Sequence, residues 1–390
     1  MCPVRGSHTG SRTRLIRWLA PGMVASLALA AAASVSAADE PPANDPADIQ
    51  PGRTISVLGV GDILVHKEII NQALEDARGT APDFYAQLSG IEGLVSSADL
   101  AVCHIEFPMG SARGPWTAWP DLPASPPQLA RAVAKVGFDT CSTASNHSFD
   151  QGFLGLSRVL NALDKSGVRH AGTARTEDEA STPTIIEVKG VRVAHLSYAY
   201  DFNGMPVPAG REWSANLIDA QRIIKEAKLA RRLGARIVIV SLHAGYEGDA
   251  NPSGQQLDVV RRLADSGMVD LVIGHHAHVI QPVDRVGAMW VAYGHGNLLS
   301  AQSRRDPRSG DGLATLFTFT EQEDGSFEAT KALGYVVHND DFPFRLSLVP
   351  RQGTATPGER GSWIRTEDVV MDLGAEGKGF RLQRWPANRA

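Results

Sequence analysis

Short apolar runs alternate with longer amphipathic stretches through most of the chain. The runs are rich in β-branched residues, which is typical of buried strands. Between them, apolar residues recur at three- and four-residue spacing with charges between, which indicates amphipathic helices. The predicted strands cover residues 54–60, 100–105, 139–144, 191–197, 236–243 and 270–273, and the predicted helices cover residues 126–136, 155–166, 219–233 and 253–266. This repeated strand–helix–strand order predicts an α/β domain with right-handed crossovers.

The pattern changes from Leu313 onward. Residues 315–321 and 327–337 alternate in a strand-like way around Asp324 and Gly325, which indicates a β-hairpin. We expect these residues to add antiparallel strands to a sheet.

Both ends of the chain differ in composition from the predicted domain, which covers residues 53–345. Residues 38–52 are rich in Pro, Ala and Asp, the composition of a flexible spacer. From about Pro350 the sequence has no strong period and is rich in Gly and Arg, so residues 346–390 are predicted to form a loosely packed tail.

Residues 1–37 have the pattern of a secretory signal peptide. Four Arg and no acidic residue occur in this segment, an apolar stretch begins at Leu19, and a small-residue cleavage site ends at Ala37. An uncleaved membrane anchor is the alternative, but the apolar stretch is rich in Ala and is interrupted by Pro21 near its start. We therefore expect export across the cytoplasmic membrane, to the periplasm or the cell exterior, with a cleaved signal.

Composition narrows the class of partner. With 43% hydrophobic and 21% charged residues the chain has a globular balance. The formal net charge is −5 although residues 1–37 are purely basic, so the rest of the chain is more acidic still. Such a chain has no obvious surface for a phosphate backbone, which excludes nucleic acid as an expected partner. An anionic substrate needs a local positive centre, such as a metal ion.

Two cysteines remain after the predicted cleavage, Cys103 and Cys141. Two are too few for a disulfide scaffold, so stability has to come from a hydrophobic core. They could form one bridge in an oxidising compartment or stay as buried thiols. We favour buried thiols, because each cysteine lies inside an apolar run.

Polar residues that bind metals cluster where the predicted strands stop. Ligand sites of open α/β sheets form at these strand ends. Eight of the twelve His fall in or beside these segments, which argues against scattered surface histidines. The residues are Asp62, His66, His104, Glu106, Asn146, His147, Asp150, His243, Glu247, His275, His276, His278 and His295.

Imidazole, carboxylate and amide oxygen together suit a divalent cation such as Zn, Mn, Fe or Ca. A His-x-His pair like His276 and His278 can reach two adjacent metals, and a carboxylate placed opposite can bridge them. Such a two-metal site hydrolyses esters. Each signal alone has an ordinary explanation, with Asp62 as a helix N-cap and Asn146-His147 as a turn. Their order at successive strand ends favours metal binding.

Six short motifs occur in order between about residues 54 and 300. They are Gly-Asp at 61–62, Ile-Glu-Phe-Pro at 105–108, Ala-Ser-Asn-His-Ser-Phe-Asp-Gln-Gly at 144–152, His-Ala-Gly-Tyr-Glu at 243–247, Gly-His-His-Ala-His-Val-Ile-Gln at 274–281 and Tyr-Gly-His-Gly-Asn at 293–297. In content and spacing they resemble the bacterial CapA/PgsA-type poly-γ-glutamate capsule-synthesis family, a branch of the calcineurin-like metallophosphatase fold.

The resemblance implies a four-layer α/β/β/α metallophosphatase-like sandwich with two divalent metal ions at the strand ends. Matched motif by motif, it assigns Asp62 and His278 to one metal, Asn146, His243 and His276 to the other, and Glu106 to a bridge between them.

The same matching assigns His147 as the acid that protonates a leaving group, with Asp150 beside it in the catalytic pair. His66 is a further candidate metal ligand, because a helical turn after Asp62 would place it on the same side.

The chain departs from the family pattern in ways that bear on the substrate. His104 replaces the usual Asn, which could add a ligand or change the preferred metal, and Ala244 replaces an aromatic residue of the pocket. His295 puts an extra imidazole near the site. We assign to substrate binding His104, Glu247, His295 and Asn297.

Three functions are compatible with these residues. The first is an exported metal-dependent protein that assists synthesis or processing of an anionic envelope polymer such as poly-γ-glutamate, within a capsule-synthesis membrane complex. The second is a free-standing extracytoplasmic hydrolase of phosphoesters. The third and most remote is a metal-dependent peptide epimerase, which the signal peptide disfavours. A protein that only binds its ligand is a further alternative, although no predicted ligand position is apolar.

Overall fold

The computed structural model describes residues 49–385, apart from residues 80, 119, 304–305 and 351–352. The predicted signal peptide and most of the predicted spacer lie outside the described residues and stay predictions. Within the described part of the chain, no helix combines the length and the apolar character that crossing a membrane requires.

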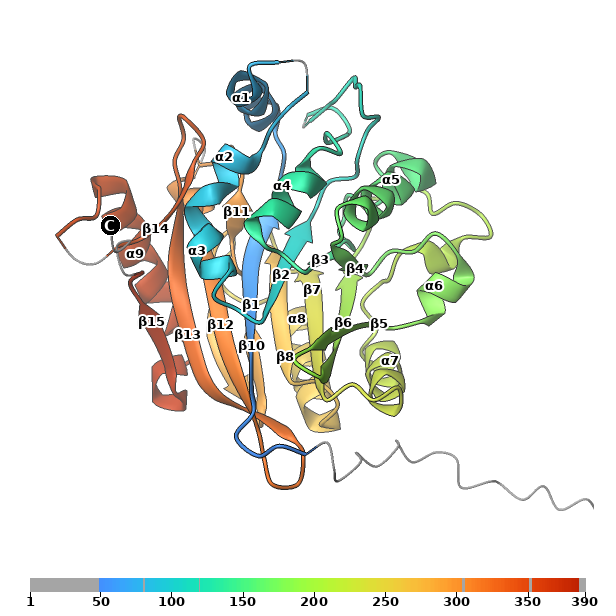
Figure 1. Cartoon of the computed structure of the whole chain (residues 1–390), viewed down its shortest axis with the longest axis vertical. Coiled ribbons are helices and arrows are strands. Elements are labelled where there is room, and N and C mark those ends of the chain that lie inside the picture. Colours follow the sequence, from blue (N-terminus) through green and yellow to red (C-terminus); the bar gives the residue numbers. More distant parts are fainter. Residues whose placement is uncertain (1–48, 80, 119, 304–305, 351–352, 386–390) are drawn as a thin grey trace, which may run out of the picture. The chain divides into compact units, whose positions relative to one another are not determined.

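Two β-sheets form the centre of the domain, one of nine strands and one of six (Figure 1). The first has the order β14 (Leu346–Leu348), β13 (Phe327–Asn339), β12 (Asp311–Glu321), β1 (Thr54–Ile63), β2 (Leu100–Ile105), β3 (Thr140–Ser142) and β4 (Arg169–Ala171), with β11 (Asn297–Leu299) on β1 and β15 (Phe380–Gln383) on β13. The second has the order β5 (Thr184–Val188), β6 (Val191–Ala199), β7 (Ile237–Ala244), β8 (Leu271–His276), β10 (Met289–Ala292) and β9 (Val283–Val286).

Helices cover the outer faces of both sheets. On the first sheet lie α1 (Lys67–Ala77), α2 (Tyr85–Leu88), α3 (Glu92–Val95), α4 (Leu129–Val136) and α5 (Gly152–Lys165), and on the second lie α7 (Ala220–Arg232) and α8 (Gly254–Ser266). The remaining helices are α6 (Glu177–Ser181) and α9 (Pro357–Val370), with short 3₁₀ turns η2 (Ser89–Ile91), η3 (Glu212–Ser214), η4 (Pro307–Gly310) and η5 (Ala375–Lys378).

Strand residues alternate between an inner and an outer core, which explains the continuous apolar runs in the sequence. In β1, Val57 packs between the two sheets whereas Leu58 packs under the helices. In β7, Ile239 faces the inner core and Val240 faces α7 and α8. The helix–sheet–sheet–helix layering confirms the predicted four-layer α/β/β/α sandwich.

Parallel pairing aligns the carboxyl ends of the central strands. β1, β2, β3 and β4 run parallel in the first sheet, and β6, β7 and β8 run parallel in the second. The register sets Asp62 opposite His104 and sets His243 opposite His275. The strand-end residues predicted from the sequence are therefore brought to one edge of each sheet.

The predicted β-hairpin is confirmed. β12 and β13 pair antiparallel around Asp324 and Gly325, and β12 joins the hairpin to the edge of β1. Short strands such as β4, β5 and β11 were not predicted, because three to five residues are too few for a period to show.

The prediction of a loosely packed tail is wrong. α9 packs on the sheet, β15 adds a parallel strand to β13, and both Val370 and Phe380 are fully buried. The buried face of α9 is spaced like a helix but is mostly polar, with Glu359, Ser362 and Thr366 preceding Val370. A hydrophobic period cannot reveal such a face. The folded part of the chain therefore continues past residue 345.

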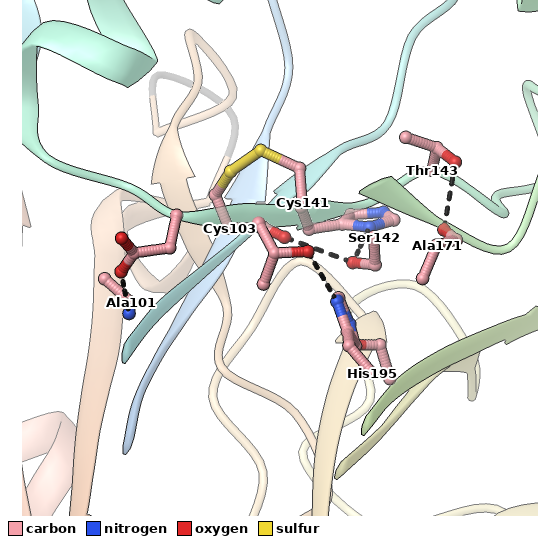
Figure 2. The surroundings of a disulfide bond; sticks show 11 residues. Ala101, Cys103, Cys141, Ser142, Thr143, Ala171 and His195 are labelled. Carbon is pink, nitrogen blue, oxygen red and sulfur yellow. Dashed lines mark hydrogen bonds between the residues drawn. A yellow bond between two sulfur atoms is a disulfide. The ribbon is translucent and has the colours of Figure 1, made fainter. Parts of the chain in front are cut away.

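The preference for free thiols is also wrong. Cys103 and Cys141 form a disulfide between β2 and β3, where they lie directly opposite each other with Cα atoms 4.4 Å apart (Figure 2). Both cysteines are fully buried, as expected. Their pairing depends on the register of two parallel strands, which apolar runs in a sequence do not specify.

Candidate metal centre

Side chains from four strand ends converge between the two sheets. Their ligand atoms form four sets of three, each set with all atoms within 4.8 Å of one another. The sets are Asp62, His104 and His275; His104, Glu106 and His243; Asp62, Glu106 and His278; and Glu247, His276 and His278. All these residues are buried except Glu247.

Asp62, near the end of β1, is fixed by the last two residues of β8. One carboxylate oxygen lies 2.8 Å from Nδ1 of His275, and the other accepts a hydrogen bond of 2.8 Å from the backbone N–H of His276. Burial alone would raise the pKa of Asp62, but the hydrogen bonds from His275 and His278 hold it well below its usual range. Asp62 is therefore a charged group in a fixed orientation.

Glu106, just after β2, is the least satisfied group of the site. Both of its carboxylate oxygens are buried and have no hydrogen-bond partner among the described residues. Nε2 of His278 lies 3.5 Å from Oε1, and Nε2 of His147 lies 3.8 Å from it. Burial raises the pKa of Glu106 above its ordinary value. A carboxylate in such surroundings needs a cation to remain ionised.

The His-x-His segment has an unusual backbone. His276 has a φ of 88° and His278 a φ of 55°, a left-handed region that residues other than glycine rarely adopt. Strain of this kind is characteristic of ligand-binding loops. Nδ1 of His278 lies 3.0 Å from the amide oxygen of Asn297, which leaves its Nε2 facing Glu106. Burial, with the charge of His278, lowers the pKa of His276 to about 3, so His276 is neutral as a ligand must be.

Asn146 and His243 are in direct contact near Glu106. Nε2 of His243 lies 2.8 Å from the amide oxygen of Asn146, across the gap between the two sheets. Burial lowers the pKa of His243 well below its usual value, and the charge of the neighbouring His276 adds to this effect. The ring centroids of His243 and His276 are 4.8 Å apart, and the ring of Tyr200 lies 4.5 Å from that of His276.

The residues present fit a centre for divalent cations. Buried polar atoms in proteins are nearly always hydrogen-bonded. Here several are not, counting every partner in the described part of the chain: His104 Nε2, both oxygens of Glu106, His243 Nδ1, His275 Nε2 and His276 Nδ1. Imidazole nitrogen and carboxylate oxygen together are the donors that Zn, Fe and Mn prefer. The assignment of individual ligands stays a prediction.

His147 and Asp150 form a hydrogen-bonded pair beside Glu106. Nδ1 of His147 lies 2.6 Å from Oδ2 of Asp150. Burial alone would lower the pKa of His147, but this hydrogen bond and the nearby Glu106 raise it above the usual value. Both residues line a cavity of about 630 Å³, together with His66, Glu247 and His278.

His66 and Glu247 both lie on the wall of the cavity, and for His66 this differs from the predicted position. β1 continues to Ile63 and α1 begins only at Lys67, so no helical turn follows Asp62; His66 lies on the cavity wall, near the backbone N–H of Ala301. Glu247 is exposed and lines the cavity, as a substrate contact requires.

His104, His295 and Asn297 are fully buried, so they have no surface on which to touch a substrate. We correct that assignment. The ring nitrogens of His295 lie within hydrogen-bonding distance of Gly274 O and Thr315 Oγ1, and Asn297 orients His278.

Two residues near the site were not singled out from the sequence, and His275 was named there only as one of the strand-end polar residues. His275 contacts Asp62, Tyr200 packs on His276, and the amide oxygen of Asn203 accepts a hydrogen bond of 3.3 Å from Asn146. Tyr200 and Asn203 follow β6, whose carboxyl end also carries polar residues in the sequence. The same rule applied there would have found both.

Comparison with known proteins gives likenesses of fold and of sequence. The solved NAD nucleotidase of Haemophilus influenzae aligns with a TM-score of 0.46 and 12% identity, over 86% of this chain and 65% of that one. The capsule biosynthesis protein CapA of Bacillus anthracis is 26% identical over 45% of this chain and 43% of its own length. The PGA biosynthesis protein CapA of Bacillus subtilis is 26% identical over 52% of this chain and 53% of its own.

The chain thus spans about half the length of these curated relatives. A sequence profile described as bacterial capsule synthesis protein PGA_cap matches residues 56–302, which is more than half of the chain and includes every predicted metal ligand. The chain therefore belongs to the bacterial capsule synthesis protein family.

Proposed function

We propose that the chain is an exported, metal-dependent hydrolase that processes an anionic envelope polymer such as poly-γ-glutamate, in association with a capsule-synthesis membrane complex. The observation that carries the proposal is the set of buried, unpartnered donors around Glu106, next to the His147–Asp150 pair on an open cavity. The relatives named for capsule and PGA biosynthesis support the choice of polymer.

Metal ions would be held in two adjacent positions. Asp62 and His278 would hold one ion, Asn146, His243 and His276 would hold the other, and Glu106 would be available to both. A divalent ion there supplies Lewis-acid polarisation of the reacting group and lowers the pKa of water.

The charge of the cavity supports metal dependence. Glu68, Asp150 and Glu247 line it, and no Lys or Arg does so among the residues with a described position. The protein surface alone therefore repels a polyanion. Carboxylate or phosphate groups can be drawn into this cavity only if metal ions outweigh those three acidic side chains.

His147 is suited to act as the general acid. Its Nδ1 is held by Asp150, so the proton available for transfer is on Nε2, on the side of Glu106. In hydrolysis, water adds to the carbonyl carbon or the phosphorus atom and the bond to the leaving group breaks. His147 gives its proton to the leaving nitrogen or oxygen, and the proton lost by water returns to His147 through solvent.

Export is supported by the disulfide. Such bonds persist in oxidising compartments outside the cytoplasm and are rare inside it. The Cys103–Cys141 bond therefore agrees with the signal peptide predicted for residues 1–37.

The test measures metal content and turnover on the same purified protein. We expect about two divalent ions per chain, and cleavage of a γ-glutamyl polymer rather than of a phosphodiester. Cleavage of the phosphodiester alone would favour the phosphoesterase alternative, and absence of bound metal would overturn the proposal.

A matched pair of histidine variants tests the catalytic assignment. His147→Asn is expected to keep the metal and lose about 10²–10³-fold in turnover. His170→Asn is the control, since His170 is also half-buried and paired with a carboxylate, Asp164 at 3.1 Å, but lies outside this cavity. Equal loss in both variants would remove His147 from the mechanism.

A further inference from the structure

His104 occupies a position that substrate binding does not explain. It lies at the end of β2 opposite Asp62, is fully buried, and stacks on the ring of His275 at 4.2 Å. Its two ring nitrogens are in different situations, and that difference suggests what the side chain does.

Nδ1 of His104 is used by the neighbouring strand. It lies 2.8 Å from the hydroxyl oxygen of Ser142, in β3. That hydroxyl donates its only proton to the carbonyl oxygen of Cys103, at 3.3 Å. Ser142 therefore accepts from an Nδ1–H of His104, and this tautomer puts the lone pair on Nε2.

Nε2 of His104 is buried and has no hydrogen-bond partner in the described residues. A ligand atom of His104 lies within 4.8 Å of ligand atoms of Glu106 and His243. With Nδ1 already bonded, Nε2 is the nitrogen free to bind a cation. A histidine whose other nitrogen is fixed by a hydrogen bond is the usual arrangement of a metal ligand.

Histidines that only pack in this fold look different. His195 is equally buried, but its nitrogens lie 3.0 Å from the hydroxyls of Thr140 and Ser241. His295, also fully buried, has hydrogen-bonding atoms near both of its nitrogens. An unpartnered nitrogen is thus not a general result of burying histidine between these sheets.

We infer that His104 is an additional metal ligand, binding through Nε2 the ion that Glu106 and His243 also bind. This inference rests on the metal centre of the proposed function. It gives that position three imidazoles, from His104, His243 and His276, beside the oxygens of Glu106 and Asn146. Such a nitrogen-rich set favours Zn²⁺ or Fe²⁺ over Mn²⁺ and Ca²⁺.

The test compares His104→Asn with His195→Asn, two equally buried histidines of which only the first has a free nitrogen. Zn²⁺ and Mn²⁺ affinities are measured by competition with a chromophoric chelator, and the coordination of Co²⁺ is followed by visible absorption. We expect His104→Asn to weaken Zn²⁺ binding at one position at least about tenfold, to weaken Mn²⁺ binding less, and to change the Co²⁺ spectrum. His195→Asn should change neither affinity nor spectrum. Parent-like binding and spectrum in His104→Asn would overturn the inference.

A crystal structure of the zinc-loaded parent protein decides the question even if His104→Asn fails to fold. We expect Nε2 of His104 at about 2.1 Å from a zinc ion. Zinc bound at Glu106 and His243 but more than about 3 Å from His104 would refute this inference and leave the proposed function intact. A protein that binds no divalent ion at all would instead refute the proposed function.

Discussion

β1 and β7 each begin beside one buried polar cluster and end beside another. At their amino ends, Arg53 and Arg236 each donate a hydrogen bond of 2.7 Å to a different oxygen of Glu321, which is fully buried at the end of β12. At their carboxyl ends, Asp62 and His243 join the candidate metal centre.

The two clusters differ in whether the chain satisfies its own carboxylate. Glu321 has a cationic partner for each oxygen, whereas neither oxygen of Glu106 has a partner in the described residues. Burial is the same in both, so burial alone does not mark a functional site. A buried carboxylate with neither oxygen satisfied marks it, because the desolvation of such a group is offset only by a ligand supplied from outside. The amino-end cluster therefore stabilises the fold, and the carboxyl-end cluster is available for chemistry.

The largest expected effect is that of Glu106→Gln. Turnover should fall at least about a thousandfold, roughly 4 kcal/mol, and metal content should fall with it, because the bridging charge is lost. The metal-free protein should be no less stable than the metal-free parent, since a neutral amide replaces a buried carboxylate without a partner. Elemental analysis measures the metal content, and urea unfolding with a chelator measures the stability of the metal-free proteins. Marked destabilisation of the metal-free variant would break the comparison, because Glu106 would then be structural like Glu321.

Glu321→Gln should have the opposite profile. It removes the carboxylate charge that Arg53 and Arg236 share and should cost about 3 kcal/mol of unfolding free energy at pH 7, with metal content unchanged. Glu328→Gln is the control, because Glu328 is exposed on β13 of the same hairpin.

The pH dependence of this effect has a definite sign. Burial alone would raise the pKa of Glu321, but hydrogen bonds from Arg53 and Arg236 lower it below its ordinary value of 4.5. The stabilisation is therefore complete above about pH 4.5 and is lost as the pH falls through the lowered folded-state value. Unfolding curves at pH 7 and pH 3 should show that the difference in unfolding free energy between Glu321→Gln and the parent is smaller at pH 3. A gap that stays constant would mean that the ion pairs contribute nothing.

The sequence predicted the elements that a simple period describes. Apolar runs without polar alternation predicted β1, β2, β6, β7 and β8 with ends correct to within three residues. Polar residues at the ends of these runs included most of the residues that converge between the sheets. The buried face of α9 is polar and therefore has no hydrophobic period. The pairing of Cys103 with Cys141 depends on the register of β2 and β3, which no sequence period reveals.

Whether a buried histidine faces a substrate, a metal or only protein could not be predicted either. His104, His295 and Asn297 are all at strand ends, and only the side chains around them distinguish their roles. These contacts come from segments distant in sequence, such as Ser142 and Thr315. Local pattern therefore locates the site but does not divide its residues into ligands and supports.

Replacing both Cys103 and Cys141 by serine tests how much the disulfide between β2 and β3 stabilises the strands that carry the carboxyl-end cluster. The bond closes a loop with a sequence separation of 38 residues, and its loss should cost about 3 kcal/mol of unfolding free energy. Urea unfolding of the variant, beside the parent with and without reductant, measures this. No difference between reduced and oxidised parent would show that the bond does not contribute.

The smallest effect is expected from Ser142→Ala, and it separates support from ligand within the carboxyl-end cluster. Ser142 touches no substrate or metal in our assignment, but its hydroxyl holds Nδ1 of His104. Its removal should weaken Zn²⁺ binding by up to about tenfold and leave the number of bound ions unchanged, because it frees the ring orientation without removing a donor. Thr140→Ala is the matched control in β3, since Thr140 makes the equivalent contact to His195. Equal effects of the two variants on zinc affinity would mean that the hydroxyls act only through packing of β3, and the contrast between satisfied and unsatisfied histidines would lose its meaning.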